Sequence, residues 1–239
     1  MHGKSSLDDH VIGEESGQCN VGPGGERENE RGCNSSKHEE PIIQQIAAAL
    51  RLYDRTVREA SVIETARLSL RLWQASDRLP FALMNANPQV MEFMPACLSR
   101  SESNAFADRM QAHFQQHGFG LYAAELRDEH RFIGFIGLSV PNFDAHFTPC
   151  VEIGWRLAAA YWRRGIATEG AHAVAAHAFE DLQMKELVSF TVPMNTASRR
   201  VMEKLGMTHD PSDDFDHPKL PNGHPLQRHV LYRLRPTTP

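Results

Sequence analysis

Apolar and polar residues alternate in the stretch ARLSLRLW, where Leu68, Leu70 and Leu72 stand between polar neighbours. A period of two predicts a half-buried strand. Short apolar runs bounded by turn residues predict further strands, over residues 119–126, 131–140, 150–157, 186–192 and 228–234.

Helical spacing of apolar residues and capping signals predict helices in the same region, over residues 77–93, 101–117, 165–182 and 195–206. Pro88 should interrupt the first helix, Ser99 should cap the second, and Gly206 should close the last. Several strands come first, and strand, helix, strand, helix and strand follow. This order indicates an α/β or α+β domain with a mixed sheet over residues 62–235.

The first 60 residues have a different pattern. Residues 1–40 are rich in Gly, Ser, Asn and Glu, and hold nine acidic side chains against four basic ones. Such a segment buries too little apolar area to offset its ordering entropy, so we expect a disordered acidic tail. Residues 41–60 have apolar residues at helical spacing behind Pro41, which predicts an accessory amphipathic helix packed on the domain or on a partner subunit. A homodimer is therefore left open.

Composition narrows the classes of function. The net charge of −5 resides in the acidic tail, so the body is neutral, which argues against general nucleic-acid binding. No apolar run is long enough for a membrane span or a secretory signal. The cysteines have no metal-type spacing and are expected to be reduced thiols of a cytoplasmic protein; they are Cys19, Cys33, Cys97 and Cys150.

The segment with the clearest chemistry is VEIGWRL followed by AAAYWRRGIATEG, a strand that leads into a helix. The first amides of a helix lack intrahelical partners and lie at the positive end of its dipole, which suits a phosphate. Gly165 allows close approach, and Arg163 and Arg164 raise the local potential. Ala167 is small, and Thr168 adds a hydroxyl. A plain strand-to-helix junction, in which Gly165 only eases a turn, is the alternative.

VEIGWRLAAAYWRRGIATEG resembles motif A of the GNAT (GCN5-related) N-acetyltransferases, and TVPMNTASRRVMEKLGM is similar to the strand and helix that follow it in that family. This version of the motif is similar to that of the branch that includes the ribosomal-protein N-terminal acetyltransferases. The resemblance covers about residues 62–235. It implies a central, mixed but mostly antiparallel sheet flanked by helices, with one splayed strand pair, and acetyl-CoA as co-substrate.

The resemblance also implies roles for individual residues. The grip on the CoA pyrophosphate would fall to Arg163, Arg164, Gly165, Ala167 and Thr168. Trp155 and Leu157 would lie on the splayed strand whose main chain pairs with the pantetheine arm, and Asn195 and Ser198 would lie near the CoA arm and the thioester. Trp162 departs from the family's usual Gln or Arg, a change common in this branch.

Acetyl transfer to an amine needs a base for the ammonium and a proton for the departing thiolate. Glu152 is the first candidate base, because it shares a strand face with Gly154 and Arg156 and the family often has an acid there. A surface ion pair with Arg156 or with a neighbouring strand is the alternative reading.

Other side chains compete for these roles. His217 and His229 are the next candidate bases, since histidine titrates near neutrality. Ser198 and Tyr232 could protonate the thiolate. Cys150 has no neighbouring histidine in sequence, so an acyl-cysteine route is not favoured and we expect direct transfer in a ternary complex.

The stretch from residue 209 to residue 229 is dense in His and Asp, but its spacing fits no usual metal site. We expect no metal there and interpret the stretch as a wall of the acceptor pocket. The leading hypothesis is an N-acetyltransferase acting on a small-molecule amine or a protein N-terminus, with the small molecule favoured. A non-catalytic CoA-binding regulator and a metal-dependent hydrolase that uses the His/Asp loop are the alternatives.

Overall fold

A single mixed sheet forms the centre of the computed structural model, which describes residues 62–236. The expected tail, residues 1–40, and the expected helix, residues 41–60, lie outside the described residues. The strands are β1 (Ile63–Glu64), β2 (Leu68–Arg71), β3 (Leu121–Leu126), β4 (Arg131–Ser139), β5 (Glu152–Leu157), β6 (Leu187–Thr191), β7 (Thr208–His209), β8 (Phe215–Asp216) and β9 (Arg228–Leu234).

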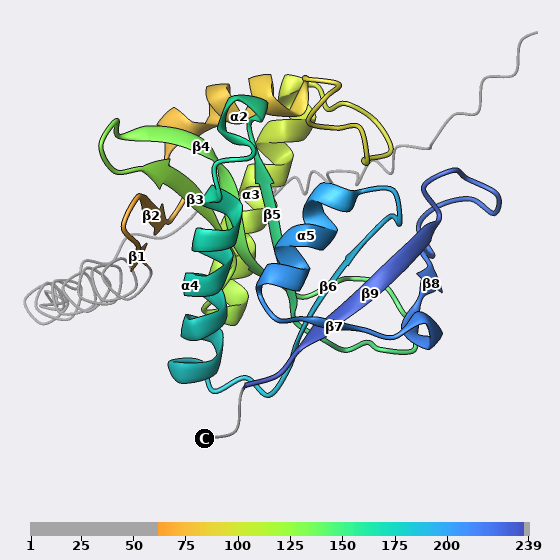
Figure 1. The fold of residues 1–239 in the computed structure, drawn as a ribbon. Coiled ribbons are helices and arrows are strands. Elements are labelled where there is room, and N and C mark those ends of the chain that lie inside the picture. Colours follow the sequence, from red (N-terminus) through yellow and green to blue (C-terminus); the bar gives the residue numbers. More distant parts are fainter. Residues whose placement is uncertain (1–61, 237–239) are drawn as a thin grey trace, which may run out of the picture. The chain divides into compact units, whose positions relative to one another are not determined.

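The strand order is β1-β2-β3-β4-β5-β6-β9-β7, and β8 also pairs with β9 (Figure 1). Every pair is antiparallel except β5 with β6, which is parallel. The expected sheet, mixed but mostly antiparallel, is confirmed.

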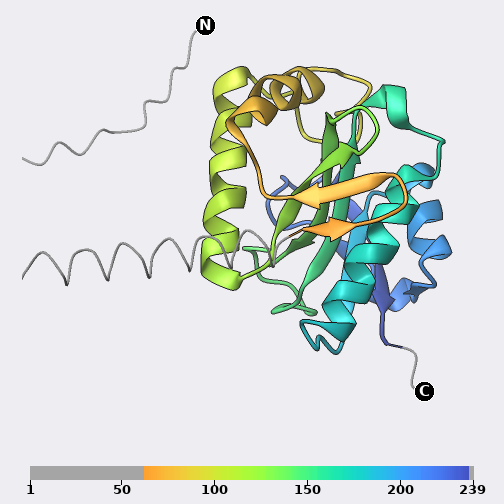
Figure 2. The same cartoon turned by 90° about the vertical axis from the view of Figure 1, so that its left-hand side faces the viewer.

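Helices cover both faces of this sheet; they are α2 (Arg78–Asn85), α3 (Arg100–His117), α4 (Ile166–Glu180) and α5 (Thr196–Lys204). Figure 2 shows α3 and α4 on opposite sides of the strands. Phe135 of β4 packs against Phe81 and Phe106 of α2 and α3. Its neighbour Ile136 points to the other face, where it lies beneath Gly170 of α4. None of these helices, in the part of the chain that is described, is long and apolar enough to cross a bilayer.

The helix ends follow their capping signals in most places. Ser99 accepts from the Glu102 amide while the Glu102 carboxylate accepts from the Ser99 amide, and α3 ends at Gly118 as expected. The prediction of a helix over residues 77–93 is wrong beyond Asn85, where α2 ends. Pro88 has no N–H and disfavours helical backbone at the residue before it, so turns replace the helix there.

The strands β1, β7 and β8 were not expected. Each has two residues, too few to show alternation, and each exists only as a partner of a longer strand. The long strands and the four helices lie where the pattern placed them, within a few residues at each end.

The centre of the sheet offers a matched pair of glycines, because Gly137 of β4 lies opposite Gly154 of β5. A Cβ on Gly137 would overlap the Gly120 carbonyl oxygen and lie 2.7 Å from Leu121 Cα, whereas a Cβ on Gly154 would meet only Glu152 Oε1 at 3.8 Å. Gly137→Ala should therefore lower the free energy of unfolding by about 2–3 kcal/mol. Gly154→Ala should change it by less than about 1 kcal/mol. Denaturant unfolding of both variants measures the difference, and equal losses would contradict this packing.

Candidate functional site

The strands β5 and β6 meet at one end and then separate (Figure 1). Their pairing has one registered residue pair, Glu152 with Val188, and the amide of Val188 donates to the carbonyl of Val151 at 2.9 Å. Backbone groups alternate in direction along a strand, so the N–H and C=O groups of Trp155 and Leu157 also point toward β6, which has by then moved away. The result is the expected splayed pair, with an unpaired main-chain edge on β5.

The chain leaves β5 through a short 3₁₀ turn (Ala159–Tyr161) and enters α4 at Gly165. Gly165 has φ 73° and Arg163 has φ 59°, so two left-handed residues turn the backbone sharply here. The first helical hydrogen bond runs from the Glu169 amide to the Gly165 carbonyl at 3.0 Å. The amides before it, at Ile166, Ala167 and Thr168, therefore have no helical acceptor. This is an anion-binding geometry built from main-chain donors.

Glu169 fixes this turn to the β1–β2 connection. Its Oε1 accepts from the Thr65 hydroxyl at 2.7 Å and from the Arg67 amide at 2.9 Å, and its Oε2 pairs with the Arg67 guanidinium at 2.6 Å. Arg67 also donates to the Arg164 carbonyl at 3.0 Å. Burial raises the pKa of Glu169, but the bonds from Thr65 and Arg67 outweigh it and hold the pKa below its ordinary value. Sequence reasoning missed this role, although an acid in the first turn of a helix is a recognisable signal.

The bulky residues of the loop lie around the same turn. Arg163 and Arg164 are exposed, and the Arg164 guanidinium lies over the Tyr161 ring at 5.6 Å. The indole N–H of Trp162 donates to the carbonyl of Leu157 at 2.7 Å. Trp162 therefore anchors the loop to the end of β5, which gives the departure from the family pattern a structural role.

On the other side of the splay, β6 leads into α5, and Asn195 caps that helix. Its side-chain oxygen accepts from the Ser198 amide at 3.2 Å, and its Nδ2 donates to Thr191 Oγ1 at 3.0 Å and to Ser198 Oγ at 3.2 Å. Asn195 thus fixes the Ser198 hydroxyl at the start of α5. Tyr232 is buried, and its hydroxyl accepts from the Arg199 Nε at 3.2 Å.

Glu152 lies where the splay begins, and its Oε2 accepts from the Ser139 hydroxyl at 3.1 Å. Burial raises its pKa to about 7, and the bond from Ser139 opposes the rise. The alternative reading, an ion pair of Glu152 with Arg156, is wrong. Arg156 donates to Asn85 Oδ1 at 2.9 Å and to Met94 Sδ at 3.1 Å instead.

His217 and His229 lie on the Glu152 face of the sheet, in an aromatic cluster with Phe143, Phe190 and Phe215. Their ring centroids are 5.1 Å apart. Burial lowers the pKa of each, so both rings are mainly neutral at pH 7. The two histidines are thus brought together, in an apolar setting rather than beside a carboxylate.

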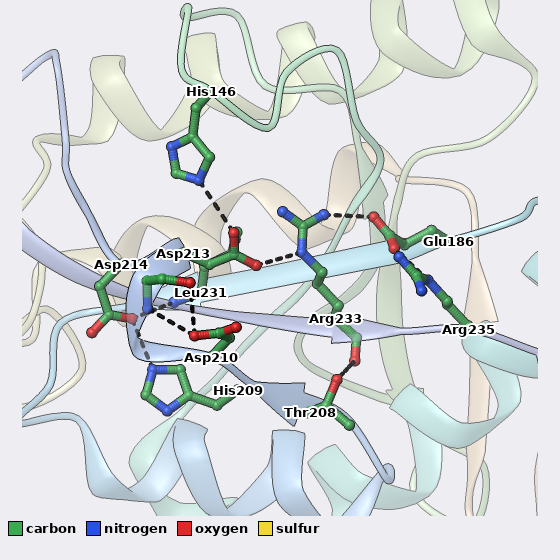
Figure 3. Close-up of polar contacts among 11 residues, drawn as sticks. His146, Glu186, Thr208, His209, Asp210, Asp213, Asp214, Leu231, Arg233 and Arg235 are labelled. Atoms are coloured by element: carbon green, nitrogen blue, oxygen red, sulfur yellow. Dashed lines mark hydrogen bonds and ion pairs between the residues drawn. The ribbon is translucent and has the colours of Figure 1, made fainter.

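Three of the four aspartates of the His/Asp loop have structural partners that Figure 3 shows. Asp213 pairs with Arg233 at 2.7 Å, and Asp214 pairs with His209 at 2.8 Å. Asp210 caps a turn by accepting from the Ser212 amide at 2.9 Å. Within residues 62–236, no three His, Cys, Asp or Glu side chains group as metal ligands.

Cys150 is half-buried beside the start of β5. Burial, chiefly, raises the pKa of its thiol to about 11, and the nearby charge of Glu152 adds to the rise. A thiol of that pKa carries little thiolate at pH 7, which agrees with the expectation that it is not a nucleophile.

The raised pKa of Glu152 has a consequence for stability. Its folded value of about 7 exceeds the ordinary 4.5, so the folded chain binds this proton more tightly and the free energy of unfolding falls as pH rises between those values. Glu152→Gln should lie within about 1 kcal/mol of the wild type at pH 5 and be more stable at pH 8 by on the order of 2–3 kcal/mol.

Glu102 supplies the control for this measurement, because hydrogen bonds from Ser99 lower its pKa. Its contribution is present at pH 8 and lost as pH falls, so Glu102→Gln should be less stable than the wild type at pH 8. Urea unfolding of the wild type and both variants at pH 5 and pH 8 measures these differences in the free energy of unfolding. A Glu152→Gln variant that is equally stable or less stable at pH 8 would refute the burial argument.

Comparisons with known proteins agree with this geometry. Residues 67–208 match the family model described as an acetyltransferase (GNAT) domain. The uncharacterised protein YkkB of Bacillus subtilis is 30% identical over 144 residues, covering 60% of this chain and 83% of that protein. The FsC-acetyl coenzyme A-N(2)-transacetylase of Aspergillus fumigatus is 30% identical over 161 residues, covering 64% and 68%.

Among solved structures, an acetyltransferase from Agrobacterium tumefaciens superimposes with a TM-score of 0.59 at 27% identity, covering 73% of this chain and 94% of that one. The family match spans more than half of the chain, and its residues include the splayed strand, the turn into α4 and the cap of α5. The chain therefore belongs to the GNAT acetyltransferase family and is an acetyl-CoA-dependent N-acetyltransferase.

Proposed function

We propose that this chain transfers the acetyl group of acetyl-CoA to a primary amine of a small molecule, directly and in a ternary complex. One observation carries the proposal. The unpaired edge of β5 runs from Glu152, a carboxyl with a pKa of about 7, to the loop that presents the free amides of α4. A long donor with a diphosphate at one end and a reacting thioester at the other fits such an edge.

The donor-binding groups are mostly main chain. The amides at Ile166, Ala167 and Thr168 would hold the pyrophosphate where Gly165 turns the chain, with Arg163 and Arg164 adding positive charge from the exposed side. The N–H and C=O groups of Trp155 and the N–H of Leu157 would pair with the pantetheine amides, as a missing strand would, while the Leu157 carbonyl is already bonded to the Trp162 indole. Asn195 and Ser198 would approach the arm from the opposite side of the splay.

Glu152 has the properties of the base. A carboxyl with a pKa of about 7 is well matched to accepting a proton near neutral pH, and its Ser139 bond holds one oxygen in place. Glu152 would take one proton from the substrate ammonium and pass it to solvent. The amine nitrogen then forms its bond to the carbonyl carbon as the carbon–sulfur bond breaks. The second amine proton reaches the sulfur through the Ser198 hydroxyl.

The acceptor side is the sheet face that Glu152 shares with the aromatic cluster of Phe143, Phe190, Phe215, His217 and His229. Phe215 and His217 belong to the His/Asp-rich stretch, which is held to the sheet by ion pairs such as Asp213 with Arg233. The Aspergillus relative's name gives acetyl-coenzyme A as donor and a nitrogen as acceptor, which supports N-acetylation here. A protein N-terminus is the second candidate acceptor.

The reaction itself is tested by thiol release from acetyl-CoA with a panel of amines and short peptides. Direct transfer predicts intersecting initial-velocity lines, whereas parallel lines would indicate an acyl-enzyme. The rate at low amine concentration should rise as pH passes through about 7, because Glu152 must be ionised. Glu152→Gln should lose about 100-fold or more in kcat with acetyl-CoA affinity unchanged.

Ser139→Ala serves as the matched variant in that profile. The Ser139 bond favours the charged form of Glu152, so its loss should move the rising limb to higher pH. A profile that is flat in the wild type, or identical in Glu152→Gln, would exclude Glu152 as the base.

The main-chain grip is tested by comparing Gly165→Val with the double variant Arg163→Ala and Arg164→Ala. Gly165 has φ 73°, which a β-branched residue adopts only with strain, so Gly165→Val should distort the amides that hold the pyrophosphate. The arginines are exposed and act through solvent-screened charge. Calorimetry with CoA should show at least about tenfold weaker binding for Gly165→Val and a smaller loss for the double variant. The reverse order would show that the arginines do the holding.

A further inference from the structure

Arg156 is a half-buried cation in the middle of the sheet, on the same face of β5 as Glu152. Its Nη1 donates to Asn85 Oδ1 at 2.9 Å and its Nη2 to Met94 Sδ at 3.1 Å. The guanidinium lies over the rings of Phe135 and Phe106, with centroids at 5.3 Å and 5.8 Å. All of these partners are neutral.

The other sheet arginines of comparable burial have two carboxylates each. Arg71 pairs with Asp77 and with Glu125, both at 2.7 Å. Arg233 pairs in the same way with two acids, at 2.7 Å each. Arg156 has no acidic partner anywhere in residues 62–236.

The pKa values of Arg156 and Arg71 reflect this difference in partners. Burial lowers the pKa of Arg156 to about 10, so the group stays charged at pH 7 without a carboxylate to offset the cost of its burial. At Arg71 burial acts in the same direction, yet Asp77 and Glu125 outweigh it and the pKa is raised. A desolvated charge without a counter-ion is costly, and an anion that reaches it recovers that cost.

The arginine is held in place rather than left to move. Asn85 is fully buried at the end of α2, and its Nδ2 donates to the Ser103 hydroxyl of α3 at 3.2 Å. The Asn85 oxygen therefore points at Arg156 from a fixed position, and the two rings confine the guanidinium plane. Such support presents the remaining N–H groups of the guanidinium in a constant direction.

Between Glu152 and Arg156 the strand has Gly154. A Cβ there would meet only Glu152 Oε1 at 3.8 Å, so this face is open between the two charged residues. Residues 152 and 156 point the same way and their Cα atoms are about 13 Å apart along an extended strand. Side chains that lean toward each other would leave room for a small molecule lying over Gly154.

We infer that the acceptor carries an anionic group, a carboxylate or a phosphate, that pairs with Arg156 while its amine lies at Glu152. The inference rests on the proposed function, because it assigns the acceptor of that same site. Arg156 is thus a specificity-determining residue, and Asn85 is the residue that positions it.

Matched pairs of amines test the inference, each pair differing only in the anion. β-Alanine is compared with β-alaninamide, and O-phosphoethanolamine with ethanolamine, by thiol release from acetyl-CoA. The wild type should favour one anionic member by about tenfold or more in kcat/KM, as a charge-assisted hydrogen bond predicts. Whichever pair shows the preference identifies carboxylate or phosphate.

The variants separate recognition from folding. Arg156→Met removes the charge, keeps a long apolar stem and should raise KM for the anionic member about tenfold or more, with kcat and the neutral member within about twofold. Arg156→Lys should retain part of the preference, since it keeps the charge without the fork. Arg235→Met removes an exposed cation paired with Glu186 and should behave as the wild type.

Each failure has its own meaning. No acetyl-CoA binding by calorimetry would overturn the proposed function. Acetyl-CoA binding with equal use of anionic and neutral amines, or an anion preference that survives Arg156→Met in a folded protein, would overturn only the inference about Arg156. Preference for peptide N-termini over every small amine would also overturn it.

Discussion

The separation of β5 from β6 is the feature on which the rest of this structure depends. Two parallel strands in the middle of a sheet would normally satisfy each other's main-chain groups along their whole length. Here pairing stops after Glu152 and Val188, because β6 turns away toward β9 while β5 stays with β4. The unpaired groups of β5 are costly unless something polar lies against them. A donor with amides along its length would remove that cost, so the fold itself favours such a ligand.

The start of α4 converts this edge into a site with a defined end. Glu169 lies within the first turn of the helix and would, by its charge, oppose the binding of a phosphate nearby. Arg67 instead neutralises its carboxylate, and Arg67 and Thr65 together tie the turn to the β1–β2 connection. Arg67 is also bonded to the Arg164 carbonyl. The free amides are consequently held in position before any ligand arrives, which lowers the entropy that binding must cost.

Sequence reasoning recovered the long strands, three of the four helices in full, and the order of the two motifs, because these depend on local periodicity and caps. It failed where two local signals compete and where a contact distant in sequence decides the outcome. The helix past Asn85 was overextended, since apolar residues there suggested continuation while Pro88 favoured turns. The Glu169–Arg67 contact joins residues 102 positions apart, and no local pattern reveals it. The alternative pairing of Arg156 with Glu152 drew on their shared strand face, but Asn85, brought near by the packing of α2, is the partner of Arg156.

Successive residues of β5 point in alternate directions, so in the proposed arrangement the donor and the acceptor are bound by different residues of the strand. Residues 153, 155 and 157 direct their main-chain groups to the open edge and their side chains toward α4, where Ile153 and Leu157 are buried in the core. Glu152 and Arg156 direct their side chains to the opposite, acceptor face, where Gly154 leaves space between them. Donor binding then depends mainly on backbone atoms, whereas acceptor choice depends on Glu152, Arg156 and the side chains of the aromatic cluster on the same face. A substitution at residue 154 or 156 can therefore change the acceptor without altering the donor edge.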